Sequence, residues 1–343
     1  MKKQARAAAL WCTVFAAALL FLNALFMPKY ISEVPEGALI AEYYQEKAPH
    51  DVVFIGDCEV YENFSPDVLW REYGIPSCIR GSAQQLIWQS YYLLKETLRY
   101  ETPRTVVFNV LSMQYAEPQN EAYNRLNLDG MRFSREKLDA VRASMTPEES
   151  FLSYLFPFLR YHDRWQDLKA EDFTALFHRD LVSDSGYLMN VQVRPAGEIP
   201  AARPLPDYDF APVCWDYLNR MADLCASHGV QLVLIKAPSL YPAWYDEWEA
   251  QIESFAETHG LPYINFLEMA DTVGINYAED TYDGGLHLNL YGAEKMSHWF
   301  GAWLMENTTA QDRRGTEPFE SVWAEKSAAY ATRKARLEAE WGT

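Results

Sequence analysis

Short apolar runs alternate with amphipathic segments along much of the chain, and this pattern predicts alternating strands and helices. Five runs rich in Val, Ile, Leu and Phe have the length of buried strands; they lie at 51–57, 77–80, 105–111, 230–236 and 261–266. Segments with apolar residues at helical spacing lie at 66–73, 86–100, 213–227, 245–258 and 291–306. Such alternation predicts an α/β protein of three layers, a mostly parallel sheet of about five strands with helices on both faces.

Residues that start and stop helices support these boundaries. Ser65 is a suitable N-cap, and Pro66 suits the first helical position after it. His228 and His259 are each followed by a glycine at the end of a helical segment. A helix C-terminus favours a cation before the terminal glycine, so we expect both histidines to cap helices rather than to take part in catalysis.

The regular alternation stops between 113 and 210, which divides the α/β domain into 51–112 and 211–308. This insertion is rich in Tyr, Phe and Trp. We expect short helices joined by irregular loops that act as a cap or lid over the carboxyl edge of the sheet. The alternative is that its aromatic side chains form a small core of their own. For residues 309–343 we predict a charged C-terminal helix. It either packs on the domain or reaches toward the membrane.

The N-terminus predicts a membrane anchor. Basic residues precede an uncharged run at 7–27, which is about as long as a bilayer core requires and is followed by Pro28. We interpret residues 1–29 as an uncleaved signal anchor whose basic end stays in the cytoplasm, so that the rest of the chain is extracytoplasmic. A cleaved signal peptide is the alternative. Residues 30–50 form a linker with a first helix at Ala38–Lys47.

Charge and cysteine content exclude several classes of function. The formal net charge is −18 and the pI about 4.8, which argues against nucleic-acid binding, because that requires a basic face. The five cysteines, Cys12, Cys58, Cys78, Cys214 and Cys225, show no CxxC spacing, so the sequence predicts neither a metal site nor a redox pair. Disulfides are possible outside the cell, and a Cys58–Cys78 bridge would block the thiol considered next.

Cys58 stands where an α/β fold places a nucleophile. The first apolar run ends in Gly56-Asp57-Cys58. A strand that ends in a sharp glycine turn holds the following side chain at the carboxyl edge of the sheet, where ligands and nucleophiles lie in such folds.

A second informative stretch is Asp283-Gly-Gly-Leu-His287, just before the last helix of the domain. Two glycines between the acid and the histidine allow a tight turn that points both side chains into one cleft. A histidine suits a general base, and a carboxylate on its other nitrogen would hold the tautomer. With Cys58 these residues make an acyl-transfer constellation, although each part alone is an ordinary turn or helix entry.

These residues, in this order, resemble the SGNH (GDSL-like) hydrolase superfamily over roughly residues 50–300, and the resemblance implies a flavodoxin-like fold. It assigns the nucleophile to Cys58, after Gly56-Asp57, and the acid and base to Asp283 and His287. It also implies an oxyanion hole made by the backbone N–H groups of Cys58 and Gly81 and the side chain of Asn109.

The sequence departs from that family in three ways. Cysteine replaces the family's serine, so a Cys58–His287 ion pair is needed to keep the thiol deprotonated, or esterase activity is changed or lost. Asp283 lies four residues before His287, where the family usually has three, and Asn109 lies inside a predicted strand. The alternatives are Asp280 or Glu279 for the acid, and Ser112 or Gln114 for the oxyanion donor.

The resemblance implies a hydrolase or O-acyltransferase acting on ester-linked acyl groups, with acetyl as the expected group, and without a cofactor. The membrane anchor resembles the branch that works beside membrane O-acyltransferases on cell-envelope glycans. A rival interpretation is a non-catalytic module that binds a glycan or an acyltransferase partner in the same cleft. A redox or thiol-transfer protein is a third, and it lacks the CxxC pair that such proteins use.

Overall fold

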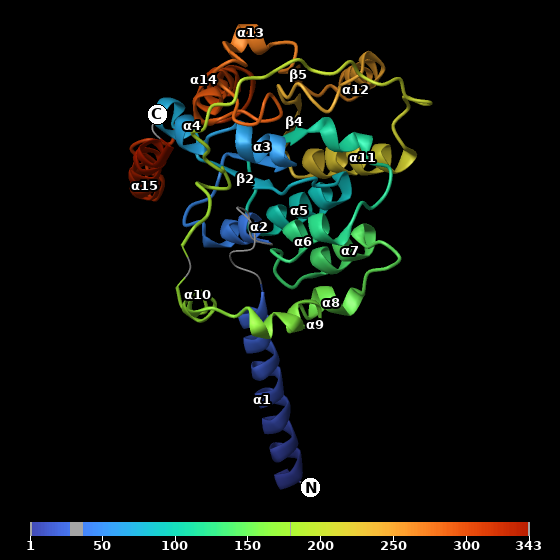
Figure 1. The fold of residues 1–343 in the computed structure, drawn as a ribbon, viewed down its shortest axis with the longest axis vertical. Helices are drawn as coiled ribbons and strands as arrows, with labels where there is room; N and C mark the ends of the chain where they lie inside the picture. Colours follow the sequence, from blue (N-terminus) through green and yellow to red (C-terminus); the bar gives the residue numbers. More distant parts are fainter. Residues whose placement is uncertain (1, 28–36, 179, 342–343) are drawn as a thin grey trace.

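A five-stranded parallel sheet lies at the centre of the protein (Figure 1). The computed structural model describes residues 2–27, 37–178 and 180–341. The strands are β1 (Val52–Gly56), β2 (Ser77–Gly81), β3 (Thr105–Asn109), β4 (Gln231–Lys236) and β5 (Tyr263–Asn265). Their order is β2-β1-β3-β4-β5 with every pair parallel, so the predicted parallel sheet is confirmed.

Helices cover both faces of the sheet. Successive side chains of a strand point to opposite sides, so each apolar strand contributes to a core on both faces. Val52 and Phe54 of β1 belong to one core cluster, and Val53 and Ile55 to the other. The first cluster includes residues of α3 (Cys58–Asn63), α4 (Pro66–Tyr73) and α14 (Leu290–Asn307). The second includes residues of α5 (Ile87–Tyr100), α11 (Pro212–Ser227) and α12 (Asp246–His259). The predicted three layers are therefore confirmed.

The termini of these helices follow the predicted capping chemistry. The Ser65 hydroxyl accepts a hydrogen bond from the backbone N–H of Val68 at 3.4 Å. The Nδ1 atoms of His228 and His259 each lie 2.9 Å from the carbonyl oxygen four residues earlier. Both histidines thus serve helix ends, as the sequence predicts.

Three local features differ from the sequence prediction. Helix α3 begins directly at Cys58 and was not predicted, because Glu-Val-Tyr-Glu-Asn has no apolar periodicity. The third strand ends at Asn109, and a 3-10 helix, η2 (Val110–Gln114), takes the residues predicted to extend it. A short helix, α13 (Ala270–Val273), follows β5.

The insertion contains α6 (Glu121–Leu128), α7 (Arg135–Ser144), α8 (Phe151–Leu155), α9 (Phe158–Tyr161), η3 (His162–Gln166) and α10 (Ala170–Thr174). Leu128, Val141 and Tyr154 form a small core with Leu93 of α5. This part of the insertion has a core of its own, as the alternative interpretation of its aromatic residues predicts. The chain then continues without helices from about 181 to 211. Whether any of it closes over the site stays a prediction.

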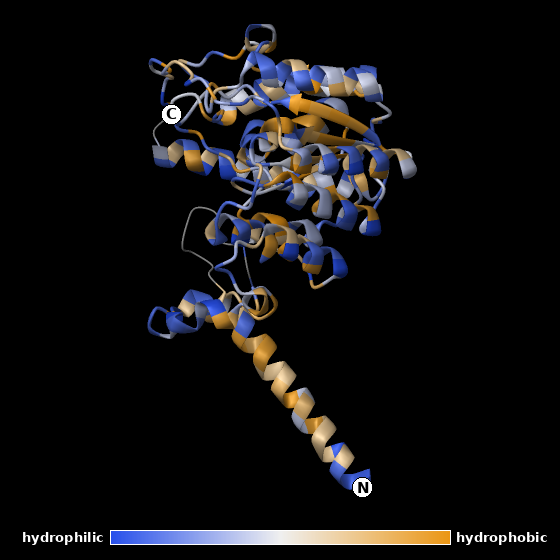
Figure 2. Cartoon of the chain, turned by 90° about the vertical axis from the view of Figure 1, so that its right-hand side faces the viewer, coloured by the Kyte–Doolittle hydropathy of each residue, from blue (hydrophilic) through white to orange (hydrophobic). Residues whose placement is uncertain are grey.

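The two ends of the chain are helical. Helix α1 (Lys2–Phe26) is long and apolar enough to cross a membrane, and it extends away from the body of the protein (Figure 2). Part of the expected linker, residues 30–36, lies outside the described residues, and α2 (Ala38–Glu42) and η1 (Tyr43–Gln45) follow it. Helix α15 (Phe319–Trp341) packs on α4, where the Trp70 and Trp323 rings stack at 5.5 Å. The C-terminal helix therefore lies on the domain.

Candidate active site

Cys58 is the first residue of α3, immediately beyond the carboxyl end of β1. Its N-cap is Asp57, whose carboxylate accepts a hydrogen bond from the N–H of Glu59 at 3.1 Å. The turn is tight, because a Cβ on Gly56 would lie 3.1 Å from the Cβ of Asn109. The side chain of Cys58 is partly exposed, so the sheet edge holds the thiol in the predicted nucleophile position.

The loop before α14 folds as the two glycines predict. Gly284 and Gly285 have φ values of +88° and +108°, which favour glycine. The N–H of Gly285 donates to the Thr281 hydroxyl at 2.8 Å. One oxygen of Asp283 accepts the N–H of His287 at 2.9 Å. These bonds bring the acid and the histidine to one side of the loop.

Asp283 and His287 are in direct contact. The second carboxylate oxygen, Oδ2 of Asp283, lies 2.7 Å from Nδ1 of His287. The extra residue between acid and base is accommodated within the turn. Of the alternatives, Asp280 accepts a bond from Lys295 Nζ at 2.6 Å instead, and Glu279 is engaged through its backbone carbonyl by Asn289.

The opposite nitrogen of His287 is not engaged by Asp283. Nε2 is buried and has no hydrogen-bond partner of ordinary geometry among the residues that the structure describes. The Cys58 thiol is nevertheless close enough for the two groups to shift each other's pKa. A buried nitrogen without a partner is uncommon in a purely structural histidine. The structure thus brings Cys58, His287 and Asp283 together, from the first strand turn and the last loop.

Sequence reasoning missed a second carboxylate, that of Glu62. Its Oε2 atom lies 3.3 Å from Nδ1 of His287, and it accepts a short hydrogen bond from the Tyr282 hydroxyl. Glu62 follows Cys58 by four residues, which places both side chains on the same face of a helix. That spacing was the available signal, but it has meaning only if the segment after Cys58 is helical.

The charges of this cluster govern its protonation. Burial alone would lower the pKa of His287, but the hydrogen bond to Asp283, the Cys58 thiol and the charge of Glu62 raise it to about 12. Burial tends to raise the pKa of Asp283, yet its bonds to His287 hold it below the usual value. Burial raises the pKa of Cys58 to about 11, although His287 acts in the opposite direction. The thiol and the imidazole are thus coupled, because the charge of each one shifts the pKa of the other.

The sequence suggests a thiolate–imidazolium pair, and this pair stays a prediction. A thiolate is favoured when positive charge outweighs burial and negative neighbours. Here Asp57 and Glu62 both add to the effect of burial on the Cys58 pKa. Because the pKa of Cys58, about 11, lies below that of His287, about 12, the thiol loses its proton first and leaves a thiolate beside the imidazolium as pH rises. Any catalysis by this cluster should therefore increase with pH.

The two other residues assigned to an oxyanion hole lie beside Cys58. Gly81 pairs with Gly56 across β1 and β2, and a Cβ there would lie 3.1 Å from the Gly56 carbonyl oxygen. The amide of Asn109 donates to Asp57 at 3.0 Å and to Glu59 at 2.8 Å. It could donate to an oxyanion only by giving up one of these bonds, so its role stays a prediction.

A buried charge network underlies the turn. Lys236 and Glu59 are both fully buried, and Nζ of Lys236 lies 3.2 Å from Oε1 of Glu59. Burial and the charge of Glu59 raise the pKa of Asp57 to about 7. Of the alternative oxyanion donors, Ser112 has a buried hydroxyl without a partner among the described residues, and the Gln114 amide bonds the Leu111 carbonyl. All five cysteines are free thiols, so there is no Cys58–Cys78 bridge.

Two cavities flank the cluster. One of about 700 Å³ is lined by Arg194, Tyr241, Tyr245, Asp283 and Gly284, among others. The other, of about 290 Å³, includes Glu62, Tyr282 and side chains of α15. The helix-free last part of the insertion lines both cavities, and the N–H of Arg194 in it donates to the Thr281 carbonyl at 2.8 Å.

Comparisons with known proteins give matches of structure only. No family model matches the chain, and no curated protein sequence matches it. A GDSL-like lipase from Bacteroides thetaiotaomicron is 14% identical with a TM-score of 0.37, over 77% of this chain and 94% of that one. A protein described as lipolytic and of the G-D-S-L family, from Desulfitobacterium hafniense, is 12% identical with a TM-score of 0.38, over 74% and 99%. A protein described as an acylhydrolase, from Bacteroides fragilis, is 12% identical with a TM-score of 0.38, over 79% and 97%.

Proposed function

We propose that this protein is a membrane-anchored esterase or O-acyltransferase that uses Cys58, His287 and Asp283 on ester-linked acyl groups. The observation that carries the proposal is the 2.7 Å contact between Asp283 and His287, made beside a Cys58 thiol that is close enough to shift the pKa of this histidine. An acid, an imidazole and a thiol in that order form an acyl-transfer system. The substrate class we propose is an acetyl ester on a cell-envelope glycan.

In the proposed mechanism, the Cys58 thiolate, formed beside the imidazolium of His287, attacks the ester carbonyl carbon. The oxyanion that forms is held by the N–H groups of Cys58 and Gly81, with Asn109 as a further donor. The imidazolium then gives its proton to the departing alkoxide, which leaves a thioester on Cys58. Water or a sugar hydroxyl, deprotonated by His287, attacks the thioester and restores the thiol. Asp283 keeps Nδ1 protonated and stabilises the imidazolium throughout.

The cavity beside Asp283 supports an extended, polar substrate. Its lining combines Tyr241 and Tyr245, whose rings suit stacking against sugars, with the cations Arg194 and Arg203. Arginine guanidinium groups bind carboxylates and phosphates. An anionic envelope glycan fits this chemistry, and a membrane O-acyltransferase is the partner we propose for supplying or removing acyl groups.

We also propose that α1 anchors the protein and that the α/β domain is extracytoplasmic. The ring of Phe158 in α9 packs against Phe26 at the end of α1, with centroids 5.1 Å apart. Trp165 and Phe177, which follow α9 in the chain, are 64% and 91% exposed. Large aromatic side chains beside the end of an apolar helix are typical of the membrane interface. The basic end of α1 then lies in the cytoplasm.

The decisive experiment compares Cys58→Ala and Cys58→Ser with the unchanged protein on a chromogenic acetyl ester between pH 7 and 10. We expect Cys58→Ala to abolish turnover, while Cys58→Ser retains part of it if the site tolerates an alcohol nucleophile. Cys214→Ala, at another buried thiol, is the matched control. Full turnover in Cys58→Ala would refute the nucleophile assignment.

A second candidate function is a non-catalytic module that binds a glycan or an acyltransferase partner. The raised pKa of Cys58 favours it, since a neutral thiol is a poor nucleophile. The two candidate functions predict different reactivity of the Cys58 thiol. Measurable alkylation of Cys58 by iodoacetamide at pH 7, faster than that of a free thiol peptide, would exclude the binding module, and negligible alkylation up to pH 10 would favour it.

A further inference from the structure

A second cluster of ligand-type side chains lies at the opposite end of the sheet from Cys58. His50 precedes β1, Cys78 is the second residue of β2, and Glu101 follows α5 directly. Parallel strands begin at the amino edge of a sheet and end at the carboxyl edge, so this cluster is separate from the candidate active site. One ligand atom from each residue lies within 4.8 Å of the other two.

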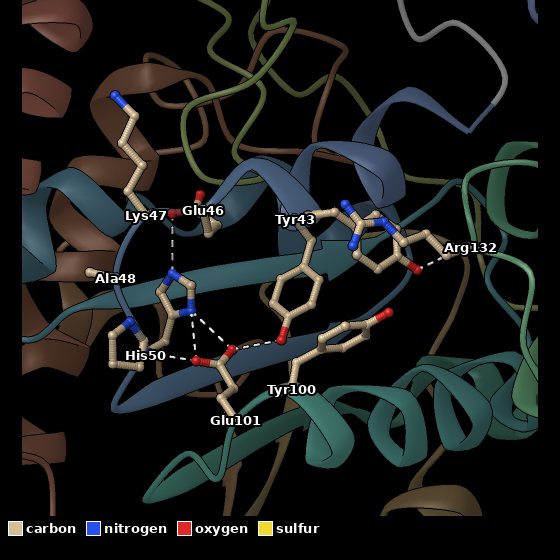
Figure 3. A pocket seen from close by; sticks show the side chains of 10 residues that line it. Tyr43, Glu46, Lys47, Ala48, His50, Tyr100, Glu101 and Arg132 are labelled. Carbon is tan, nitrogen blue, oxygen red and sulfur yellow. Dashed lines mark hydrogen bonds and ion pairs between the residues drawn. The ribbon is translucent and has the colours of Figure 1, made fainter.

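The surrounding hydrogen bonds fix two of the three side chains (Figure 3). Nδ1 of His50 lies 3.0 Å from Oε1 of Glu101, and Nε2 lies 3.3 Å from Oε2 of Glu46. The Glu101 carboxylate also accepts the N–H of His50 at 2.7 Å and the Tyr43 hydroxyl at 2.8 Å. Outer donors of this kind orient the ligands of metal sites. The imidazole and the carboxylate are thus held before any ion arrives.

The cluster combines burial with access. His50 and Cys78 are 4% and 2% exposed. A cavity of about 300 Å³ is lined by His50 and Glu101 together with Tyr43, Tyr100 and other residues. That volume accommodates several water molecules. A cation bound by the three residues would have protein on one side and a route for water on the other.

The charges suit a divalent ion. A divalent ion would displace the proton of the Cys78 thiol and bind one nitrogen of a neutral His50 imidazole, because metal ligands must be deprotonated. Neutral imidazole, thiolate and one carboxylate then balance its two positive charges without any other change.

We propose that His50, Cys78 and Glu101 form a binding site for a divalent transition-metal ion of the zinc type. Nitrogen, sulfur and oxygen from His, Cys and Glu are the donors that zinc takes, and three protein ligands leave a fourth position for water from the cavity. The ion would tie the entry to β1, the start of β2 and the end of α5 together. The site makes no use of Cys58 or His287 and does not depend on the proposed function.

Cobalt(II) tests this site, because a thiolate ligand gives cobalt a charge-transfer absorption in the near ultraviolet. Full-length protein in detergent, stripped with a chelator, is titrated with CoCl₂ and then with ZnCl₂. We expect one cobalt per chain, the thiolate band, and loss of the band when zinc replaces cobalt. Cys78→Ser should abolish the band, whereas Cys225→Ser, at another buried thiol, and Cys58→Ser should retain it.

Glu101→Gln is the second variant, since its amide oxygen can still accept bonds from Tyr43 and the His50 N–H. We expect it to keep the thiolate band but to weaken cobalt binding by at least about tenfold, because an amide oxygen is a weaker ligand than a carboxylate and loss of even an outer-shell partner typically costs that much. Circular dichroism checks that each variant is folded. Absence of stoichiometric cobalt binding, a band that persists in Cys78→Ser, or unchanged affinity in Glu101→Gln would each overturn the proposal.

Discussion

Glu62 and Asp283 approach the same nitrogen of His287, at 3.3 Å and 2.7 Å. Asp283 also binds the backbone of the histidine loop, whereas Glu62 comes from the helix that begins with Cys58. The second carboxylate therefore links the protonation of the histidine to the segment that carries the thiol. It adds negative charge beside both groups, and this contributes to the raised pKa values of His287 and Cys58.

Replacing Glu62 by Gln should make Cys58 reactive at lower pH. The substitution removes a negative charge that raises the Cys58 pKa, while Asp283 continues to hold His287 as an imidazolium. We expect the midpoint of the pH dependence of iodoacetamide labelling to fall by on the order of one unit. Glu72→Gln is a matched control, because Glu72 pairs with the exposed His298. A midpoint that is unchanged, or that moves equally in both variants, would contradict this coupling.

Asp283→Asn should impair turnover more than it impairs folding. An asparagine can still accept the loop N–H groups, but it cannot stabilise the imidazolium, and it favours the wrong tautomer. In triads of this type that change costs on the order of 10³–10⁴ in kcat. The measurement is kcat on the acetyl ester at high pH, with Asp271→Asn, an exposed position on α13, as the control. Retained kcat in Asp283→Asn would remove Asp283 from the mechanism.

The strand and helix pattern was predictable because it depends on local apolar spacing. The runs at β1 and β4 are nearly all apolar, so their place in a buried parallel sheet could be read directly. Helix α3 could not be, since Glu59 and Glu62 are buried by charge partners that lie far away in the sequence. Polar residues that are buried by ion pairs do not contribute to the apolar periodicity from which a helix is predicted.

The candidate site was predictable in its main residues and not in its electrostatics. The glycine turn and the spacing from Asp283 to His287 were enough to expect the contact between them. The protonation of the cluster depends on the burial of Cys58 and on Glu62, which only the packing of α3 reveals. The same holds for Asn109, whose amide is taken up by Asp57 and Glu59.

Lys236→Met should strongly destabilise the fold. It leaves the buried Glu59 carboxylate, next to Asp57, without its cation, and breaking a buried pair in this way costs about 3–5 kcal/mol. The double variant Lys236→Met/Glu59→Gln should recover much of that loss. The free energy of unfolding is measured by urea denaturation, with Arg220→Met, which breaks a half-exposed pair, as the control. Equal losses of unfolding free energy in Lys236→Met and Arg220→Met would show that the buried network does not support the turn.

The same network gives a pH dependence of stability. Because the pKa of Asp57 is raised to about 7 in the folded state, the folded protein holds a proton that the unfolded chain releases near pH 4. The contribution of Asp57 is therefore fully present below about pH 4 and is lost as pH rises through 7. In Asp57→Asn the unfolding free energy should fall less between pH 5 and 8 than in the unchanged protein. An equal fall in the variant and the unchanged protein would show that Asp57 does not hold a proton in the folded state across this range.

The orientation of α1 can be tested in intact cells by cysteine labelling. In a Cys58→Ala background, the remaining native thiols outside α1 are buried, so new cysteines at exposed positions report their own side of the membrane. Asn307→Cys, at the end of α14, should react with a membrane-impermeant maleimide without lysis if the domain is extracytoplasmic. Lys2→Cys should react only after lysis, because a basic helix end stays in the cytoplasm. The reverse pattern would place the domain inside the cell and would exclude an envelope glycan as its substrate.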